Sequence, residues 1–102
     1  MLRDEFLESP SNRSVSIGDK AKFTCRPPRG EPTPKVLWMK GRKFLTDSGR
    51  IQISENGDLI ISQVSLKDAD DYKCIATNTA GERESAPARL TVLGTLSFFT
   101  NY

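Results

Sequence analysis

Hydrophobic and polar residues alternate in short runs along most of this chain. The run "KAKFTCR" puts Ala21, Phe23 and Cys25 on one side and two lysines and a threonine near them on the other. Similar short runs follow in "RIQIS", "DYKCIATN" and "ARLTVL", while "KVLWMK" and "DLIIS" are short runs with apolar residues on both faces. Because successive side chains of a strand point to opposite faces, this pattern indicates half-buried strands. Turn signals separate the runs about every ten residues, so the sequence predicts an all-β sandwich or barrel.

Proline and glycine mark the turns between these runs. The segment "PPRGEPTP" (27–34) carries four prolines and a glycine, and prolines exclude a central strand, so we expect a loop there. Asn56-Gly57 lies between two apolar runs and is a strong hairpin signal, in which both central residues need a positive φ. The best helical candidate, "VSLKDADD", covers about two turns.

Composition excludes several classes of function. The 102 residues are enough for one domain with a single core. The chain has no histidine, which removes the commonest general base and the commonest zinc ligand. No nucleophile–base pair and no phosphate-binding glycine motif is visible, so we expect a non-enzymatic protein without a cofactor. The formal net charge of +2 comes from scattered basic residues, which argues against nucleic acid as a partner. Cys25 and Cys74 have no close cysteine or histidine companion and fit no metal motif.

The start of the chain does not have the pattern of a signal peptide. "MLRDEFLESP" has charges where a signal peptide needs an apolar run. We therefore expect either a cytosolic protein or a piece of a longer chain, and we favour the piece. No apolar run approaches the ~20 residues that a membrane-spanning helix needs.

Six residues have the spacing of a known all-β family: Cys25, Trp38, Leu59, Asp68, Tyr72 and Cys74. The array L-x-I-x-x-V-x-x-x-D-A-x-x-Y-x-C from Leu59 to Cys74 resembles the intermediate (I) set of immunoglobulin domains. The resemblance covers roughly residues 6–93. It implies a sandwich of two antiparallel sheets joined by a Cys25–Cys74 disulfide, with Trp38 and Leu59 in the core and Tyr72 forming a tyrosine corner.

The same resemblance assigns a structural role to the acidic stretch "DADDYKC". A Ca²⁺ site at Asp68, Asp70 and Asp71 would need several more oxygen ligands converging in space. In the family, the aspartate at the position of Asp68 typically pairs with an arginine that opens the fourth strand, and Arg50 matches that arginine. We therefore expect an Arg50–Asp68 ion pair and no metal site. Asp70 stands where the family usually has glycine, so we expect a small left-handed strain there.

Less generic pieces of the sequence narrow the resemblance. "LRDEF", "PPRGEPTP", "GRIQI", "NGDLII" and "TNTAGERESAPARLTVL" look like the second immunoglobulin domain of the Roundabout family, the axon-guidance receptors for Slit. By this resemblance residues 1–5 are a linker from a preceding domain, or the start of an expressed fragment. Residues 6–93 are the domain and residues 94–102 a C-terminal tail. The tail "GTLSFFTNY" is apolar and uncharged, and is either a chain end or a cover for an exposed edge.

The resemblance implies a recognition module in the extracellular part of a plasma-membrane receptor, contributing to the binding of Slit and of heparan sulfate. In that family the preceding, first domain makes the main Slit contact, so this domain alone is expected to bind Slit weakly or not at all. Two alternatives stay open: a homophilic cell-adhesion domain of another neuronal receptor, and an intracellular I-set domain of a giant muscle protein. The redox state of the cysteines separates the muscle protein from the receptors, because disulfides are rare in the cytosol.

Three sets of residues are candidate surface sites. Strand alternation turns one set away from the core, on the sheet that contains Trp38, as a candidate partner face with an apolar stripe: Leu37, Met39, Lys73, Ile75, Thr77, Arg89 and Thr91. Basic side chains form the candidate contacts for heparan sulfate: Arg3, Lys20, Lys22, Arg29, Lys35, Lys40, Arg42 and Lys43. Asn12 opens the N-glycosylation triplet Asn12-Arg13-Ser14. The simpler interpretations are scattered surface apolars, charges that only confer solubility, and a chance triplet.

Overall fold

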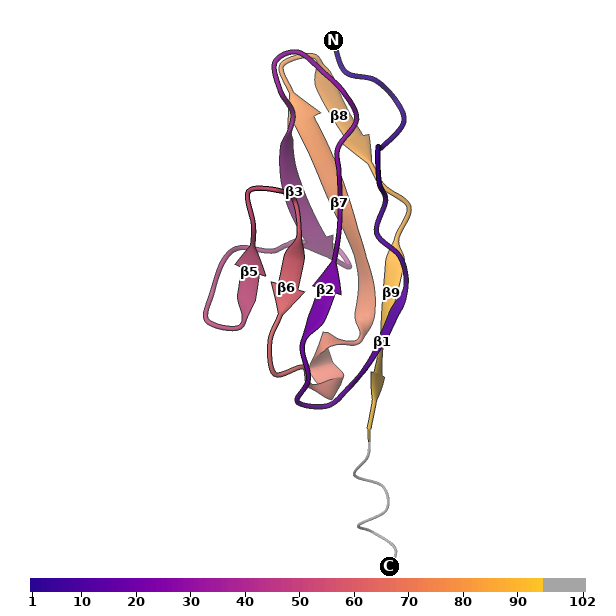
Figure 1. Ribbon diagram of the computed structural model, residues 1–102, viewed down its shortest axis with the longest axis vertical. Coiled ribbons are helices and arrows are strands. Elements are labelled where there is room, and N and C mark those ends of the chain that lie inside the picture. Colours follow the sequence, from indigo (N-terminus) through magenta and orange to yellow (C-terminus); the bar gives the residue numbers. More distant parts are fainter. Residues whose placement is uncertain (95–102) are drawn as a thin grey trace, which may run out of the picture.

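The computed structural model describes residues 1–94, which form two β-sheets packed face to face (Figure 1). The larger sheet has the order β1-β9-β7-β3-β4, with β8 also paired to β7, and the smaller sheet has the order β2-β6-β5. The strands of the two sheets are β1 (Arg13–Ser16), β2 (Ala21–Phe23), β3 (Lys35–Lys40), β4 (Lys43–Phe44), β5 (Ile51–Ile53), β6 (Leu59–Ile61), β7 (Asp70–Asn78), β8 (Gly81–Glu84) and β9 (Ala88–Leu93). A single 3-10 turn, η1 (Leu66–Asp68), interrupts the strands of this part of the chain.

The two sheets are joined by a disulfide between Cys25, just past β2, and Cys74 in β7. Both cysteines are fully buried, and Trp38, Leu59 and Tyr72 lie in the same core cluster. The ring of Phe23 fills the space between the two aromatic residues, with centroids 6.2 Å from Trp38 and 5.2 Å from Tyr72. Burying a large apolar side chain contributes about 2–3 kcal/mol. The predicted all-β sandwich, with sheets linked by this disulfide, is confirmed.

One strand pairing departs from the expected antiparallel sheets. β1 runs parallel to β9, with Arg13 opposite Leu90 and Ser16 opposite Leu93. The chain before β1 makes an isolated antiparallel bridge with the segment that follows β2, where Glu8 lies opposite Arg26. The chain then crosses to the larger sheet without reversing its direction. Because its direction is unchanged, the same stretch of chain is antiparallel to the segment after β2 and then parallel to β9.

Two local expectations about backbone conformation are wrong. The hairpin predicted at Asn56-Gly57 is present, since β5 and β6 pair antiparallel on either side of it, but its turn differs. Gly57 has a φ of +101° and Asn56 has no positive φ, because residues 54–58 form a longer turn in which the Gly57 N–H donates to Ser54 O at 3.0 Å. Asp70 also lacks a positive φ and opens β7 as an ordinary strand residue. Its carboxylate instead lies against Gly41 of the β3–β4 turn, which has the positive φ of +57°.

Candidate recognition surfaces

The acidic stretch at the start of β7 closes the sandwich through internal contacts. Arg50 donates two hydrogen bonds to the carboxylate of Asp68, at 3.0 and 3.3 Å, and the Ser65 N–H donates a third at 2.8 Å. The Tyr72 hydroxyl donates to the Asp68 carbonyl oxygen at 2.6 Å, which is the hydrogen bond of a tyrosine corner. The structure thus brings together every partner that the sequence assigned to this corner.

These contacts shift the pKa values of the groups involved. Burial alone would raise the pKa of Asp68, but the hydrogen bonds from Arg50 and Ser65, with the charges of Arg50 and Lys40, lower it below its ordinary value. The pKa of Arg50 is raised by the hydrogen bond and charge of Asp68. Burial, followed by the charges of Asp68 and Asp70, raises the pKa of Tyr72. Asp68 therefore stays an anion, and Tyr72 a neutral donor, at neutral pH.

The other acidic residues of this stretch also have contacts within the fold. Asp71 faces Arg89 across the β7–β9 pair, with Nη1 of Arg89 3.3 Å from its carboxylate. Across residues 1–94 there is no group of three or more aspartate, glutamate, cysteine or histidine side chains placed to hold a metal ion. Asp68 is ion-paired with Arg50 in the partly buried corner, Asp71 is paired with Arg89 at the surface, and Asp70 accepts a hydrogen bond from the Asp71 N–H.

Residues 1–5, for which we expected a linker, lie against the β2–β3 loop. The N-terminal amino group donates to Glu31 O at 2.7 Å, and the Glu31 N–H returns a hydrogen bond to Met1 O at 2.8 Å. The Arg3 N–H donates to Arg29 O at 2.8 Å, and the side chain of Leu2 is buried. These residues form part of the folded surface at this end of the molecule.

Two side chains from the β7–β8 hairpin fix the same segment. Asn78 donates to both Met1 O, at 3.0 Å, and Pro32 O, at 2.9 Å. Arg83 donates to Leu2 O and to the Asp4 carboxylate, at 3.0 and 2.9 Å. The local sequence pattern does not predict these contacts, because each joins residues that are far apart along the chain. The shortest separation is the 46 positions between Asn78 and Pro32.

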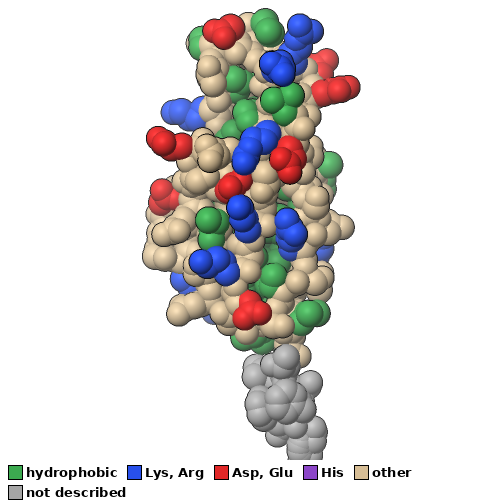
Figure 2. Space-filling model, in the orientation of Figure 1, with side chains coloured by type: hydrophobic (Ala, Val, Ile, Leu, Met, Phe, Trp, Pro, Cys, Tyr) green, Lys and Arg blue, Asp and Glu red, His purple; other side chains and the backbone are tan. Residues whose placement is uncertain are grey.

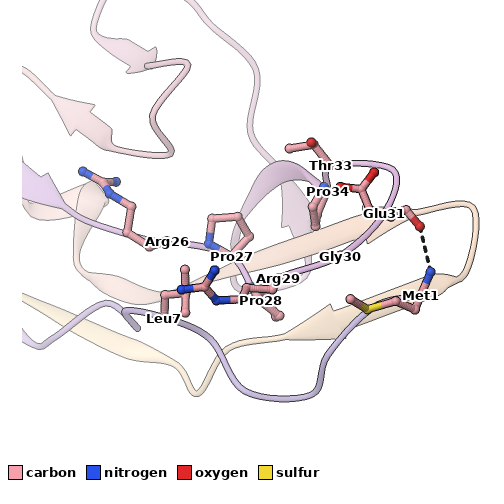
Figure 3. Close-up of a pocket in the computed structure, with 10 residues that line it drawn as sticks. All are labelled: Met1, Leu7, Arg26, Pro27, Pro28, Arg29, Gly30, Glu31, Thr33 and Pro34. Atoms are coloured by element: carbon pink, nitrogen blue, oxygen red, sulfur yellow. Dashed lines mark hydrogen bonds between the residues drawn. The ribbon is translucent and has the colours of Figure 1, made fainter.

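An open groove of 360 Å³ lies where this segment meets the proline-rich loop (Figure 3). Its lining is mostly apolar: Met1, Leu7, Pro27, Pro28 and Pro34, with the stems of Arg26 and Arg29. Figure 3 shows the hydrogen bond from the Met1 amino group to Glu31 closing one end of it. The charged residues of its lining are Arg26, Arg29 and Glu31.

The candidate partner face is only partly as expected. Leu37 is exposed and Met39 partly so, but Ile75 is only 3% exposed, and its inclusion in an exposed stripe is wrong. The reason is that β7 lies inside the sheet, where Ile75 is flanked by Leu37 of β3 and Glu84 of β8. Sequence reasoning missed Phe44, which is 60% exposed and paired with Met39.

The remaining members of this face lie at the surface. Lys73 pairs with Glu84 at 2.7 Å, and Arg89 with Asp71. Thr77 is half-buried beside Glu82, and Thr91 is exposed on β9. The face is therefore polar over β7, β8 and β9 and apolar over β3 and β4.

The basic candidates for heparan sulfate do not converge on one patch. One group surrounds the β2–β3 loop: Arg3, Arg29 and Lys35. A second lies at the β3–β4 turn: Lys40, Arg42 and Lys43. The length of β3, about 17 Å, separates Lys35 from Lys40. Lys20 and Lys22 lie at β2, where Lys22 is 3.5 Å from the Asp58 carboxylate, and Lys40 donates to Lys67 O. On the face shown in Figure 2, basic and acidic side chains interleave.

Asn12 lies exposed just before β1. Its Oδ1 accepts a hydrogen bond from the Arg89 N–H at 2.8 Å. That bond uses the oxygen of the amide, whereas N-glycosylation modifies the nitrogen. The C-terminal tail lies outside the described residues apart from Gly94. Within residues 1–94, no helix is long and apolar enough to cross a membrane.

Known proteins resemble this chain along most of its length. The immunoglobulin I-set domain model matches residues 4–92. Roundabout homolog 3 of Homo sapiens is 46% identical over 99 residues, covering 96% of this chain and 7% of that protein. Protein sax-3 of Caenorhabditis elegans is 43% identical over 94 residues, covering 90% of this chain and again 7% of the relative. The chain thus spans a small part of the length of these relatives.

Solved structures share the fold. The tandem Ig repeats of Dlar superpose with a TM-score of 0.82 at 26% identity, covering 88% of this chain and 48% of that one. A chain of the complex between titin M10 and obscurin-like 1 Ig gives a TM-score of 0.81 at 36% identity, covering 88% and 93%. The chain therefore belongs to the immunoglobulin I-set domain family, and Roundabout proteins are among its relatives.

Proposed function

We propose that this chain is a non-catalytic recognition module in the extracellular part of a Roundabout-type receptor at the plasma membrane. In this role it contributes to binding a Slit-like protein and heparan sulfate, beside neighbouring immunoglobulin domains. The observation that carries the proposal is the identity of 40–46% to Roundabout homologs 1, 2 and 3 over at least 90% of the chain.

The main alternative is an intracellular I-set domain of a giant muscle protein. The observation that supports this alternative is the 36% sequence identity to a chain of the titin M10–obscurin-like 1 complex. The Cys25–Cys74 disulfide favours the extracellular reading, because reducing buffers keep cytosolic thiols free. A thiol titration of the protein purified from its natural source, in denaturant, separates the two. We expect no reactive thiol before reduction and two after it, whereas two thiols before reduction would support the muscle protein.

Heparan sulfate binding is tested on heparin resin with two triple variants of matched charge. One replaces Arg3, Arg29 and Lys35 with alanine, and the other replaces Lys40, Arg42 and Lys43. We expect the unmodified protein to elute above about 0.15 M salt, since specific contacts with a polyanion outlast physiological screening. One triple variant should elute much earlier than the other, because the two groups lie at opposite ends of β3. Elution of the unmodified protein at or below physiological salt contradicts this part of the proposal.

The Slit contribution is tested on a receptor fragment that includes the preceding domain. Surface plasmon resonance with an immobilised Slit ligand compares that fragment with the same fragment lacking residues 1–102. We expect weaker binding without this domain and little binding by this domain alone. Equal affinities for the two fragments would remove Slit from the proposal and leave heparan sulfate to its own test.

Glycosylation of Asn12 forms a separate part of the proposal. The side chain is exposed on a segment outside the core, as an acceptor site requires. We expect secretion from eukaryotic cells to give a protein whose mass falls on treatment with N-glycosidase. An Asn12→Gln variant with the same mass as the treated protein would support the site, and an untreated protein of unmodified mass would refute it.

A further inference from the structure

The turn that joins β5 to β6 presents an asparagine in a chemically reactive setting (Figure 1). Asn56 is the only asparagine of the chain that is followed by glycine. Its side chain is exposed, and within residues 1–94 Asn56 is held through its backbone carbonyl oxygen rather than through its side-chain amide. Asn12 and Asn78 differ, because their side-chain amides make hydrogen bonds of 2.8 and 3.0 Å with the backbone. The amide of Asn56 is therefore free to react.

An asparagine in such a setting loses its side-chain nitrogen without an enzyme, and asparagine is one of the thermolabile residues. The backbone nitrogen of the following residue gives its proton to a base and attacks the side-chain carbon Cγ. The new N–Cγ bond closes a five-membered succinimide ring, while the Cγ–Nδ2 bond breaks and Nδ2 takes up a proton and leaves as ammonia. Water then opens the ring to aspartate or to isoaspartate, in which the main chain passes through Cγ. One water is consumed and one ammonia is released, with no oxidation or reduction.

Two features of this turn favour the attack. Gly57 has no side chain beside its nitrogen, so nothing hinders the approach to Cγ of Asn56. Nη1 of Arg26 donates to the carbonyl oxygen of Asn56 at 2.7 Å. This charge-assisted hydrogen bond draws electron density from the peptide bond between Asn56 and Gly57. The Gly57 N–H is consequently more acidic, and its nitrogen is more readily converted to the attacking form.

The hydrogen bonds of the turn oppose the attack. The Gly57 N–H donates to Ser54 O at 3.0 Å, so its nitrogen reaches Cγ only after the turn opens. Ser54 and Asp58 close the turn further, with the Ser54 N–H donating to Asp58 O at 2.9 Å and the Asp58 N–H donating to Ser54 Oγ at 3.1 Å. The flanking strands have three residues each, and such short hairpins open locally without global unfolding. Opening of the turn therefore sets the rate.

We propose that Asn56 is a deamidation site of the folded protein, where opening of the turn 54–58 limits its conversion to aspartate and isoaspartate. The new carboxylate lowers the formal net charge by one unit from +2 and adjoins Asp58, which is paired with Arg26 at 3.0 Å. Isoaspartate also lengthens the main chain between β5 and β6, beside the Gly57 carbonyl that accepts from the Trp38 indole at 3.1 Å. The modification thus loosens this hairpin irreversibly as the molecule ages. It goes beyond ligand recognition and does not depend on the identity of the receptor's ligand.

The test is incubation of the full chain at physiological temperature, at neutral pH and one pH unit higher, followed by peptide mass mapping and by enzymatic methylation of isoaspartate. We expect the peptide containing Asn56 to gain the mass of an amide-to-carboxyl change and to become a methyl acceptor. The reaction should be faster at the higher pH, because the attacking nitrogen must lose its proton. Asn12 and Asn78 are controls within the same molecule and should stay intact. A synthetic peptide of residues 51–61 should react at least about tenfold faster than the folded chain, because it has no turn to open.

Three variants sharpen the test. Ser54→Ala removes the hydroxyl that accepts from the Asp58 N–H, so it should speed the conversion of Asn56 at least about threefold. Asn56→Gln should stay unmodified, because ring closure from the longer side chain is slow. Asn56→Asp has the charge of the product and an unaltered main chain. The isoaspartyl fraction, separated from the unmodified chain by its extra negative charge, should therefore melt at a lower temperature than Asn56→Asp.

The outcomes separate the parts of the proposal. An Asn56 that stays intact in the folded chain while the peptide is converted overturns the proposal, as does equal conversion at Asn12 and Asn78. Equal rates for Ser54→Ala and the unmodified chain would refute control by the turn. Equal melting temperatures for the isoaspartyl fraction and Asn56→Asp would refute the loosening of the hairpin.

Discussion

Asp68 is a buried carboxylate that connects three parts of the chain. Its side chain accepts hydrogen bonds from Arg50, which directly precedes β5, and from the Ser65 backbone, while its carbonyl oxygen accepts one from Tyr72 in β7. The side chain of Asp68 is 5% exposed and that of Arg50 43% exposed. Arg50 reaches solvent and Asp68 does not. Removing the arginine would therefore leave a buried anion without its main counter-charge, which lowers the stability of the fold.

Arg50→Ala is therefore expected to lower the free energy of unfolding by about 2 kcal/mol. This value is below the ~3–5 kcal/mol for breaking a fully buried pair, because water reaches Arg50. Urea unfolding followed by the fluorescence of Trp38 measures it. Arg89→Ala is the matched control, because the Arg89–Asp71 pair is more than half exposed on both sides and should change stability by less than about 1 kcal/mol. Equal effects of the two substitutions would contradict the structural role given to Asp68.

Asp68 and Asp58 also predict how stability depends on pH. The pKa of Asp58 is lowered against its burial by hydrogen bonds and charges from Arg26 and Lys22, as that of Asp68 is lowered by Arg50. Folded carboxylates of lowered pKa bind fewer protons than the unfolded chain, so their stabilisation is complete above pH ~4 and is lost as the pH falls through their folded values. Unfolding free energies from pH 7 to pH 2 should show this decline. The unfolding free energy of Asp68→Asn should fall less steeply as the pH is lowered. If it falls as steeply as in the unmodified protein, groups other than Asp68 cause the pH dependence.

The elements differ in how far their positions follow from the sequence. Strand β2 alternates cleanly, with Ala21 and Phe23 buried and Lys22 exposed, because it has one face on the core. In β3, β6 and β7 apolar residues also occupy the other face, although the inward positions still recur with period two. The segment "ESAPARLTVL" instead splits, with β8 ending at Glu84 and β9 beginning at Ala88. The cause is a long-range contact: Ser85 is held by Cys74, whose N–H donates to Ser85 Oγ at 3.0 Å and whose carbonyl accepts from the Ser85 N–H.

The residues of the candidate surfaces also differ in how far the sequence predicts them. The Arg50–Asp68–Tyr72 corner follows from a residue array that many chains share, so the resemblance supplies it. Phe44 and the contacts of Asn78 depend on which strands become neighbours, and no local pattern records that. Burial of Ile75 has the same origin, since alternation gives the side of a sheet on which a residue lies and not what flanks it.

The turn between β5 and β6 depends on one glycine. A Cβ at Gly57 would collide with the carbonyl oxygen of Cys25, and the carbonyl of Gly57 accepts from the indole N–H of Trp38 at 3.1 Å. Gly57→Ala is expected to lower the unfolding free energy by more than about 3 kcal/mol, through strain at positive φ and this collision. Gly18→Ala isolates the strain, since its φ of +91° is similar and nothing lies within 4 Å of the added Cβ. Thermal unfolding of both should place Gly18→Ala well above Gly57→Ala, and equal melting temperatures would exclude the collision.

At the scale of the whole molecule, the candidate surfaces follow one another along β3. The N-terminal segment and one basic group lie at the end with the β2–β3 loop, the second basic group lies at the β3–β4 turn, and the candidate partner face lies between these two ends of β3 (Figure 1). The disulfide and its surrounding side chains form the core beneath all three. Substitutions at one surface should therefore leave the others folded and testable, and their effects on stability should add.

The disulfide itself gives the last prediction. It links residues 49 positions apart across the two sheets, and closing a loop of that length restricts the unfolded chain by about 4 kcal/mol in the chain-entropy account. A Cys25→Ala, Cys74→Ala variant should lose stability by about that amount while keeping its strands, because Trp38, Phe23 and Tyr72 still fill the core. Urea unfolding measures the loss, and amide proton spectra check the strands. A double variant as stable as the unmodified protein would show that the fold does not depend on the disulfide.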